Sequence, residues 1–457
     1  MRDLALPRLP ARLSARLRDL RTRTGPRDLA LALLLKVGGS GLAFLMLTLA
    51  ARAMGLHEFG VFAYWFSALS FAAAAVLLGQ EAAIMIDWQR ALEAGGPAAA
   101  RAALRRSTRL VLIAAPAGGV LTACAGHLAG AGWLFSALAG TFSVLLAVLV
   151  YGTHVARTVA GIARGDGQFE LTWRLFPTAG AALALLAGLP FHAETFFAWA
   201  VGGILVALAI QAAGVGAALR GAAAATGPVR TALDPTRVWA ARSARLWLGG
   251  VLDAANQYVD VFLIGLLLSP VEAGLYYAAA RIAALFAIVS AGLHVFSSRE
   301  IARHAADPAG PGMREALRLV GAATGLAVGG GVLVVVTGGQ ILLDLFGAAF
   351  HAAYLPLVIL TVGVAAMALG GPVPAVMRLT GHEAAYARIA GLFVLARCAC
   401  VATAALADGL IGASLASALC SLACAVVLNA SCRRRVGIDP SVLGLFGGAG
   451  PFRGTHP

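Results

Sequence analysis

The feature that most limits how this chain can fold is a series of long apolar runs, each carrying very few charges. Sixty per cent of the residues are hydrophobic and only 12% are charged, a balance that soluble domains of this length do not show. Runs of about 20 residues match a membrane-spanning α-helix, whereas a spanning β-strand needs only about 10 alternating residues. The sequence therefore predicts an all-α, polytopic membrane protein.

We predict about twelve transmembrane helices. Two connecting segments, 88–109 and 299–318, have amphipathic helical spacing and are expected to lie on the membrane surface. The motif GGPVP at 370–374 should kink or end the tenth span. The predicted spans are residues 29–53, 60–86, 109–128, 132–154, 171–189, 194–217, 243–268, 272–296, 319–337, 354–376, 384–407 and 410–431.

The distribution of arginine supports this count and gives the topology. An Arg-rich leader precedes the first span, which we interpret as uncleaved. With both termini on the cytoplasmic side, the inner segments hold nearly all the arginines outside the spans, and the outer turns hold almost none beyond Arg52. This is the asymmetry expected from the positive-inside rule. The net charge of +14 then reflects topology and contact with anionic lipids rather than nucleic acid.

A weak internal repeat divides the chain into two halves. LHEFGVFAYW at 56–65 aligns with PVEAGLYYAA at 270–279, so that Glu58 matches Glu272 and Gly60 matches Gly274. A repeat of this length suggests two pseudo-symmetric six-helix lobes around a central cavity. We expect a cytoplasmic leader, an N-terminal lobe, a cytoplasmic linker, a C-terminal lobe and a cytoplasmic tail at 1–28, 29–217, 218–242, 243–432 and 433–457.

Several segments together resemble the polysaccharide and oligosaccharide flippases of the multidrug/oligosaccharidyl-lipid/polysaccharide exporter superfamily. The segments are 51–70, 256–282, 342–363, 381–389 and 409–422, and the resemblance extends from about residue 30 to 437. It implies two six-helix lobes that form a V around a cavity. It also implies translocation of a polyprenyl-diphosphate-linked oligosaccharide, such as a lipopolysaccharide or exopolysaccharide unit, across the bacterial inner membrane. The chain lacks the two additional C-terminal spans of the peptidoglycan-precursor branch.

A substrate with a diphosphate and a glycan requires fixed cations and hydroxyl-binding groups within the spans. Arg281, deep in the eighth span, is the first candidate for the diphosphate, because a guanidinium binds two phosphate oxygens at once. The alternative is a structural ion pair with Asp260. The other candidates for substrate binding are Lys36, Arg52, Arg397, Tyr277 and Gln257.

Three carboxylates are candidates for coupling or gating: Asp260, Asp253 and Glu81. Asp260 is either a proton-coupling group or, as we prefer, a counter-ion, and Asp253 lies on the same polar face of the seventh span. Lys36 is the only lysine and either reaches the headgroups or pairs with Glu81. Arg52 is either interfacial or an exit-side contact, and the Tyr277 ring either stacks on sugars or belongs to an aromatic belt.

A cation-coupled drug antiporter of the same superfamily is the closest alternative function, and it would favour acidic over basic groups in the cavity. An enzyme is disfavoured because the sequence has no phosphate loop, catalytic triad pattern or zinc spacing. We expect no cofactor and no metal, and transport coupled to an ion or to the membrane potential. The expected partners are the lipid-linked oligosaccharide, membrane lipids, and a polysaccharide polymerase with glycosyltransferases.

Overall fold

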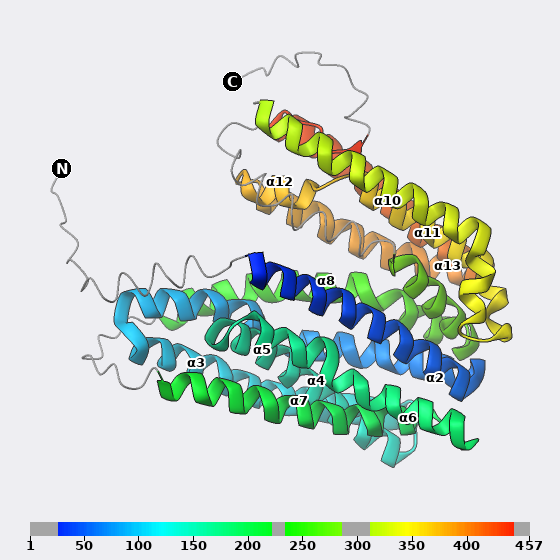
Figure 1. The fold of residues 1–457 in the computed structure, drawn as a ribbon, viewed down its shortest axis with the longest axis horizontal. Helices are drawn as coiled ribbons and strands as arrows, with labels where there is room; N and C mark the ends of the chain where they lie inside the picture. The colour runs from blue at the N-terminus through cyan, green and yellow to red at the C-terminus, as the bar shows by residue number, and fades with distance from the viewer. Residues whose placement is uncertain (1–25, 222–233, 286–310, 443–457) are drawn as a thin grey trace.

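The structure is a computed structural model, and it describes residues 26–221, 234–285 and 311–442. These residues form helices joined by short connections (Figure 1). The N-terminal part contains α2 (Pro26–Ala75), α3 (Gln80–Leu128), α4 (Trp133–Ala160), α5 (Ile162–Gly167), the π-helix η1 (Gln168–Thr172), α6 (Trp173–Ala187) and α7 (Ala193–Gly221). The C-terminal part contains α8 (Thr236–Leu267), a helix that begins at residue 270 and is described to 285, α10 (Pro311–Asp344), the 3₁₀ helix η2 (Ala348–Ala353), α11 (Tyr354–Leu369), α12 (Val373–Leu379) and α13 (Glu383–Val436).

Within the described residues, helix is present in every predicted span. Seven stretches are long and apolar enough to cross a membrane, judged by length and composition. The first of them, Leu34–Leu128, covers three predicted spans, and the last, Glu383–Val436, covers two. The chain breaks within them at Gly55 (φ 75°), Gly96 (φ 70°) and Gly409 (φ 60°). Positive φ is readily accessible only to glycine, so these residues permit the sharp changes of direction between spans.

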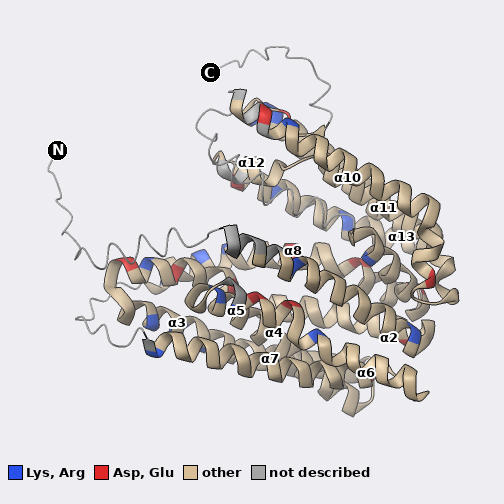
Figure 2. Ribbon diagram, viewed as in Figure 1, with Lys and Arg blue, Asp and Glu red and all other residues tan. Residues whose placement is uncertain are grey.

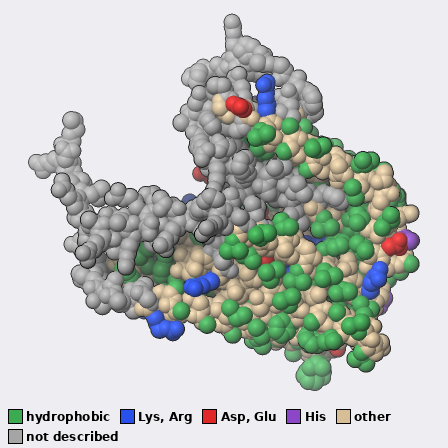
Figure 3. Space-filling view, in the orientation of Figure 1, with side chains coloured by type: hydrophobic (Ala, Val, Ile, Leu, Met, Phe, Trp, Pro, Cys, Tyr) green, Lys and Arg blue, Asp and Glu red, His purple; other side chains and the backbone are tan. Residues whose placement is uncertain are grey.

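Large apolar side chains face outward over the helix surfaces. Leu186, Leu326 and Ile113 expose 86%, 81% and 71% of their area, and hydrophobic atoms cover much of the visible face in Figure 3. Charged side chains are few along the helices (Figure 2). Such an apolar exterior is unfavourable in water and matches a hydrocarbon environment. The prediction of an all-α, multi-pass membrane protein is confirmed.

The helices form two groups whose axes diverge. α2 to α7 pack together, α10 to α13 form the second group, and the groups converge near the end of α10 and the break of α2 (Figure 1). α8 connects them, because it packs against both α2 and α13. Fully buried aromatic residues fill the region where the groups meet: Phe59, Phe62, Phe142, Phe196, Phe197, Tyr277, Phe346 and Phe350.

The two turns that aligned in the sequence contact each other directly. A Cβ atom added at Gly60 would lie 1.8 Å from the carbonyl oxygen of Pro270, and one added at Gly274 would lie 3.0 Å from Cα of Gly60. Any side chain at Gly60 would overlap backbone atoms. The aligned glycines therefore permit the backbones of the two halves to meet at this point.

Two local expectations have different outcomes. Residues 88–109 were expected to form a segment of amphipathic helical spacing on the membrane surface, and in the structure they are helical but interrupted. They form the end of one helical arm and the start of another, because the chain turns at Gly96. By contrast, α11 does end before the GGPVP motif, with Gly371 at φ 77°. Most of the second predicted amphipathic segment, 299–318, lies outside the described residues.

Candidate functional site

Arg281 lies on an aromatic surface. Its Cζ atom is 4.7 Å from the centre of the Tyr277 ring and 5.9 Å from that of Tyr258, distances at which a guanidinium is attracted to the ring face. Tyr277 is buried, and its ring also contacts Phe59 and Phe62 of α2. Within the described residues, no carboxylate lies within ion-pair distance of Arg281. Among the described residues, the contacts of this guanidinium are thus with aromatic rings.

Asp260 has a different partner from the one the sequence suggested. The side chain is 7% exposed and forms an ion pair with Arg397, at 2.8 Å from Nη2 and with a second hydrogen bond of 3.1 Å from Nε. Tyr276 and Ser417 donate hydrogen bonds of 2.8 and 2.9 Å to the same carboxylate. In the structure Asp260 is thus the counter-ion of Arg397, and among the described residues it forms no ion pair with Arg281.

This network also occupies Arg397. Besides Asp260, its guanidinium donates to the side-chain oxygen of Asn256 at 2.8 Å and to the backbone carbonyl of Asn256 at 2.9 Å. The donors are directed at α8, and the side chain is only 18% exposed. The structure therefore assigns Arg397 a structural contact between α8 and α13, which weakens its case as a substrate ligand.

Lys36 pairs with Glu170, and not with Glu81 as one of its two sequence interpretations proposed. The Lys36 amine lies 2.8 Å from one oxygen of Glu170, and Nη1 of Arg174 lies 2.7 Å from the other. Glu170 lies within the π-helix η1, a feature often found at functional sites. A Cβ atom at Gly39 would be 2.6 Å from Cβ of Glu170, so the close approach requires glycine. The carboxylate is 9% exposed, whereas the Lys36 side chain is 68% exposed.

The remaining candidates do not join one site. Arg52 donates hydrogen bonds of 2.8 and 2.9 Å to the backbone carbonyls of Leu345 and Asp344 at the end of α10, where a cation is favoured by the helix dipole. Glu81 lies beside Gly250 of α8. Gln257 and Asp253 are exposed on α8. The structure thus brings together Arg281 with Tyr277, and Asp260 with Arg397.

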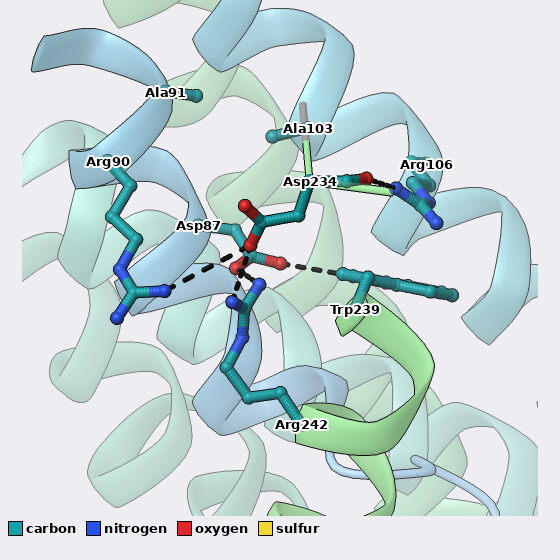
Figure 4. A pocket seen from close by; sticks show the side chains of 8 residues that line it. All are labelled: Asp87, Arg90, Ala91, Ala103, Arg106, Asp234, Trp239 and Arg242. Carbon is teal, nitrogen blue, oxygen red and sulfur yellow. Dashed lines mark hydrogen bonds and ion pairs between the residues drawn. The ribbon is translucent and has the colours of Figure 1, made fainter. Parts of the chain in front are cut away.

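Sequence reasoning missed a second cluster of charges, shown in Figure 4. It lies where the two arms of α3 meet the beginning of α8, and it consists of Asp87, Arg90, Arg106, Asp234, Trp239 and Arg242. Arg242 forms ion pairs with both Asp87 and Asp234. Burial raises the pKa of the Asp87 carboxyl, and the Arg242 guanidinium acts in the opposite direction. The only sequence signal was the concentration of charges in the two segments between spans.

Comparisons with known proteins define the fold. No family model matches the chain, and no curated protein matches it in sequence. Solved structures do match. An inward-facing multidrug resistance MATE transporter of the MOP superfamily shares 13% identity and a TM-score of 0.70, covering 87% of this chain and 94% of its own. The lipid II flippase MurJ, in an inward closed conformation, shares 12% identity and a TM-score of 0.67, covering 88% and 87%.

A third match comes from Pyrococcus furiosus. It is a MOP superfamily transporter whose reverse polarity of the binding pocket suggests a different function, and it shares 12% identity and a TM-score of 0.62 over 92% of this chain and 96% of its own. The chain is thus a multi-pass helical membrane protein with the fold of the MOP superfamily transporters. At these identities the likeness establishes the fold alone.

Proposed function

We propose that this protein is a flippase that moves a polyprenyl-diphosphate-linked oligosaccharide across the bacterial inner membrane for the synthesis of a surface polysaccharide. The two six-helix lobes, 29–217 and 243–432, alternate in opening to either side, and both termini are cytoplasmic. Glycosyltransferases act before this step, and a polysaccharide polymerase acts after it. Transport is driven by an ion gradient or by the membrane potential.

The observation that carries this proposal is the state of Arg281. Among the cations in the spans, Arg397 and Arg174 are held by carboxylates, whereas Arg281 lies on aromatic rings with no carboxylate beside it in the described residues. A charge held within the apolar region without a counter-ion is costly. An anionic substrate that supplies the counter-ion offsets this cost, and a diphosphate matches the guanidinium in charge and geometry.

The state of Asp260 argues against the alternative, a cation-coupled drug antiporter. An antiporter of that kind needs a carboxylate that can exchange a proton or a drug cation. Asp260 is instead surrounded by one guanidinium and two hydroxyl donors. A drug cation at this carboxylate has to displace Arg397 first, which leaves a buried charge unpaired.

The test measures flipping in proteoliposomes that contain a fluorescent polyprenyl-diphosphate-linked oligosaccharide under an imposed membrane potential. We expect Arg281→Ala to lower the initial rate by at least about tenfold, because a charge-assisted phosphate contact is lost, and Arg281→Lys to recover part of it. Arg388→Ala removes an exposed arginine of α13 and is the matched control. Unchanged flipping by a folded Arg281→Ala protein contradicts the proposal, as does efflux of cationic drugs without flipping.

A further inference from the structure

The cluster at the beginning of α8 forms a small pocket outside the site proposed above. It is an open cleft lined by charged side chains, Trp239 and two alanines. Asp87 and Arg90 come from the first arm of α3, Arg106 comes from the second arm, and Trp239 and Arg242 come from α8 (Figure 4). Asp234, just before α8, completes the wall. The pocket therefore depends on the reversal of the chain at Gly96.

The charges of this pocket do not balance. Three guanidinium groups face two carboxylates, and Arg242 alone contacts both Asp87 and Asp234. Arg90 comes no closer than 4.0 Å to Asp234, and its side chain is 64% exposed. One positive charge thus remains at the mouth of the pocket, available to an anion.

Two nitrogen atoms in the pocket also lack acceptors. Arg106 donates to the backbone carbonyl of Asp234 at 3.0 Å and lies with its Cζ atom 4.0 Å from the centre of the Trp239 ring. Its Nη2 atom is nevertheless buried with no hydrogen-bond partner in the described residues, and so is Nε of Arg242. Buried donors without acceptors are rare and costly, and an anionic oxygen would satisfy them.

The surroundings of the pocket indicate the source of that anion. Val238, next to Trp239, is 53% exposed, and Ile113, two turns beyond Arg106, is 71% exposed. These apolar side chains face lipid, whereas the pocket lies near the helix ends, where phosphates of the bilayer are found. Arginine-lined pockets between helices at this level bind phospholipid headgroups.

We propose that this pocket binds the phosphate of an anionic phospholipid, with Arg90 and Arg106 as its ligands. The bound lipid bridges α3 and α8, which belong to the first and the second repeat of the sequence. The inference is independent of the transported substrate, because the binding measurement below does not involve transport.

The experiment is a titration of the purified full-length protein, in neutral detergent, with phosphatidylglycerol or phosphatidylcholine, and bound lipid is counted by native mass spectrometry. We expect phosphatidylglycerol to bind at least about tenfold more tightly, because its headgroup has no cation to repel the arginines. Arg90→Gln with Arg106→Gln should remove this preference. Arg105→Gln removes one charge, as Arg90→Gln alone does, from an exposed neighbour outside the pocket and should retain the preference.

Each other result has a defined meaning. If the double variant does not fold, the single variant Arg90→Gln tests the proposal. It should fold, because this exposed side chain loses only a 4.0 Å ion pair. It should weaken phosphatidylglycerol binding about threefold or more. Equal binding of both lipids, or an equal loss in Arg105→Gln, overturns the proposal. Inorganic pyrophosphate that displaces phosphatidylglycerol supports phosphate recognition. Binding of pyrophosphate but not of phosphatidylglycerol, lost in Arg90→Gln, overturns the phospholipid source.

Discussion

In each half of the molecule, a charged network joins the first span to the fifth. The two networks differ in which of these helices bears the base, and in how exposed their side chains are. In the N-terminal half, Lys36 of the first span contacts Glu170 just before the fifth. In the C-terminal half, Asp260 of the seventh span contacts Arg397 of the eleventh. The base is thus on the first helix of one half and on the fifth helix of the other. The repeat preserves which helices pack together, whereas their side chains have diverged.

The difference in exposure separates the roles of the two networks. The Asp260 and Arg397 side chains are 7% and 18% exposed, whereas Lys36 is 68% exposed beside a Glu170 that also has Arg174. The C-terminal network is closed, and removing either partner leaves a buried charge. If Lys36 is removed from the N-terminal network, Arg174 still balances the charge of Glu170. We therefore interpret Asp260–Arg397 as a structural pair and propose that Lys36 is an exchangeable cation.

The largest expected effect is from Arg397→Ala. It leaves the Asp260 carboxylate buried with only hydroxyl donors, which should cost about 3–5 kcal/mol of stability. The measurement is thermal unfolding of the detergent-solubilised protein. The double variant Arg397→Ala with Asp260→Ala removes both charges and should recover most of the loss. If Arg397→Ala unfolds at the wild-type temperature, the buried Asp260 carboxylate does not depend on Arg397 as its counter-ion.

A smaller effect is expected from Gly39→Ala. The added methyl group would lie 2.6 Å from Cβ of Glu170, so α2 and η1 must move apart, at a cost of about 1–3 kcal/mol. Gly41→Ala is the matched control, because nothing lies within 4 Å of a Cβ atom there. Equal unfolding temperatures for the two variants contradict the close approach.

The smallest effect on stability is expected from Lys36→Gln. The lost ion pair is exposed on the lysine side and Glu170 keeps Arg174, so the change should be below about 1 kcal/mol. If Lys36 contacts the diphosphate, the same variant should nevertheless slow flipping in the proteoliposome assay. A loss of stability as large as that of Arg397→Ala removes the distinction between the two networks.

The sequence predicted the helices well because their signals are local. Apolar runs set the length of each span, and turns such as Gly55 and Asp408–Gly409 interrupt the helices where the predicted spans end. The alignment of Gly60 with Gly274 also identified two turns that come into contact.

Partners of the intramembrane charges were predicted poorly. Arg281 and Asp260 were expected to lie at similar depth on the two sides of one turn, yet the partner of Asp260 is Arg397, 137 residues away. Glu170 is 134 residues from Lys36. Such pairs depend on which helices are neighbours and on the rotation of each helix about its axis, and hydropathy encodes neither. The pocket at the beginning of α8 was missed for the same reason.

The contact between Gly60 and Pro270 has a consequence for how such a chain can evolve. In a protein whose halves repeat each other, a residue near the pseudo-symmetry axis faces its own counterpart, so its size matters on both sides of the same contact. The charged networks differ between the halves in which helix bears the base. The meeting point has kept glycine at both aligned positions. Residues that contact only their own half can therefore diverge, whereas residues that contact their counterparts in the other half are constrained.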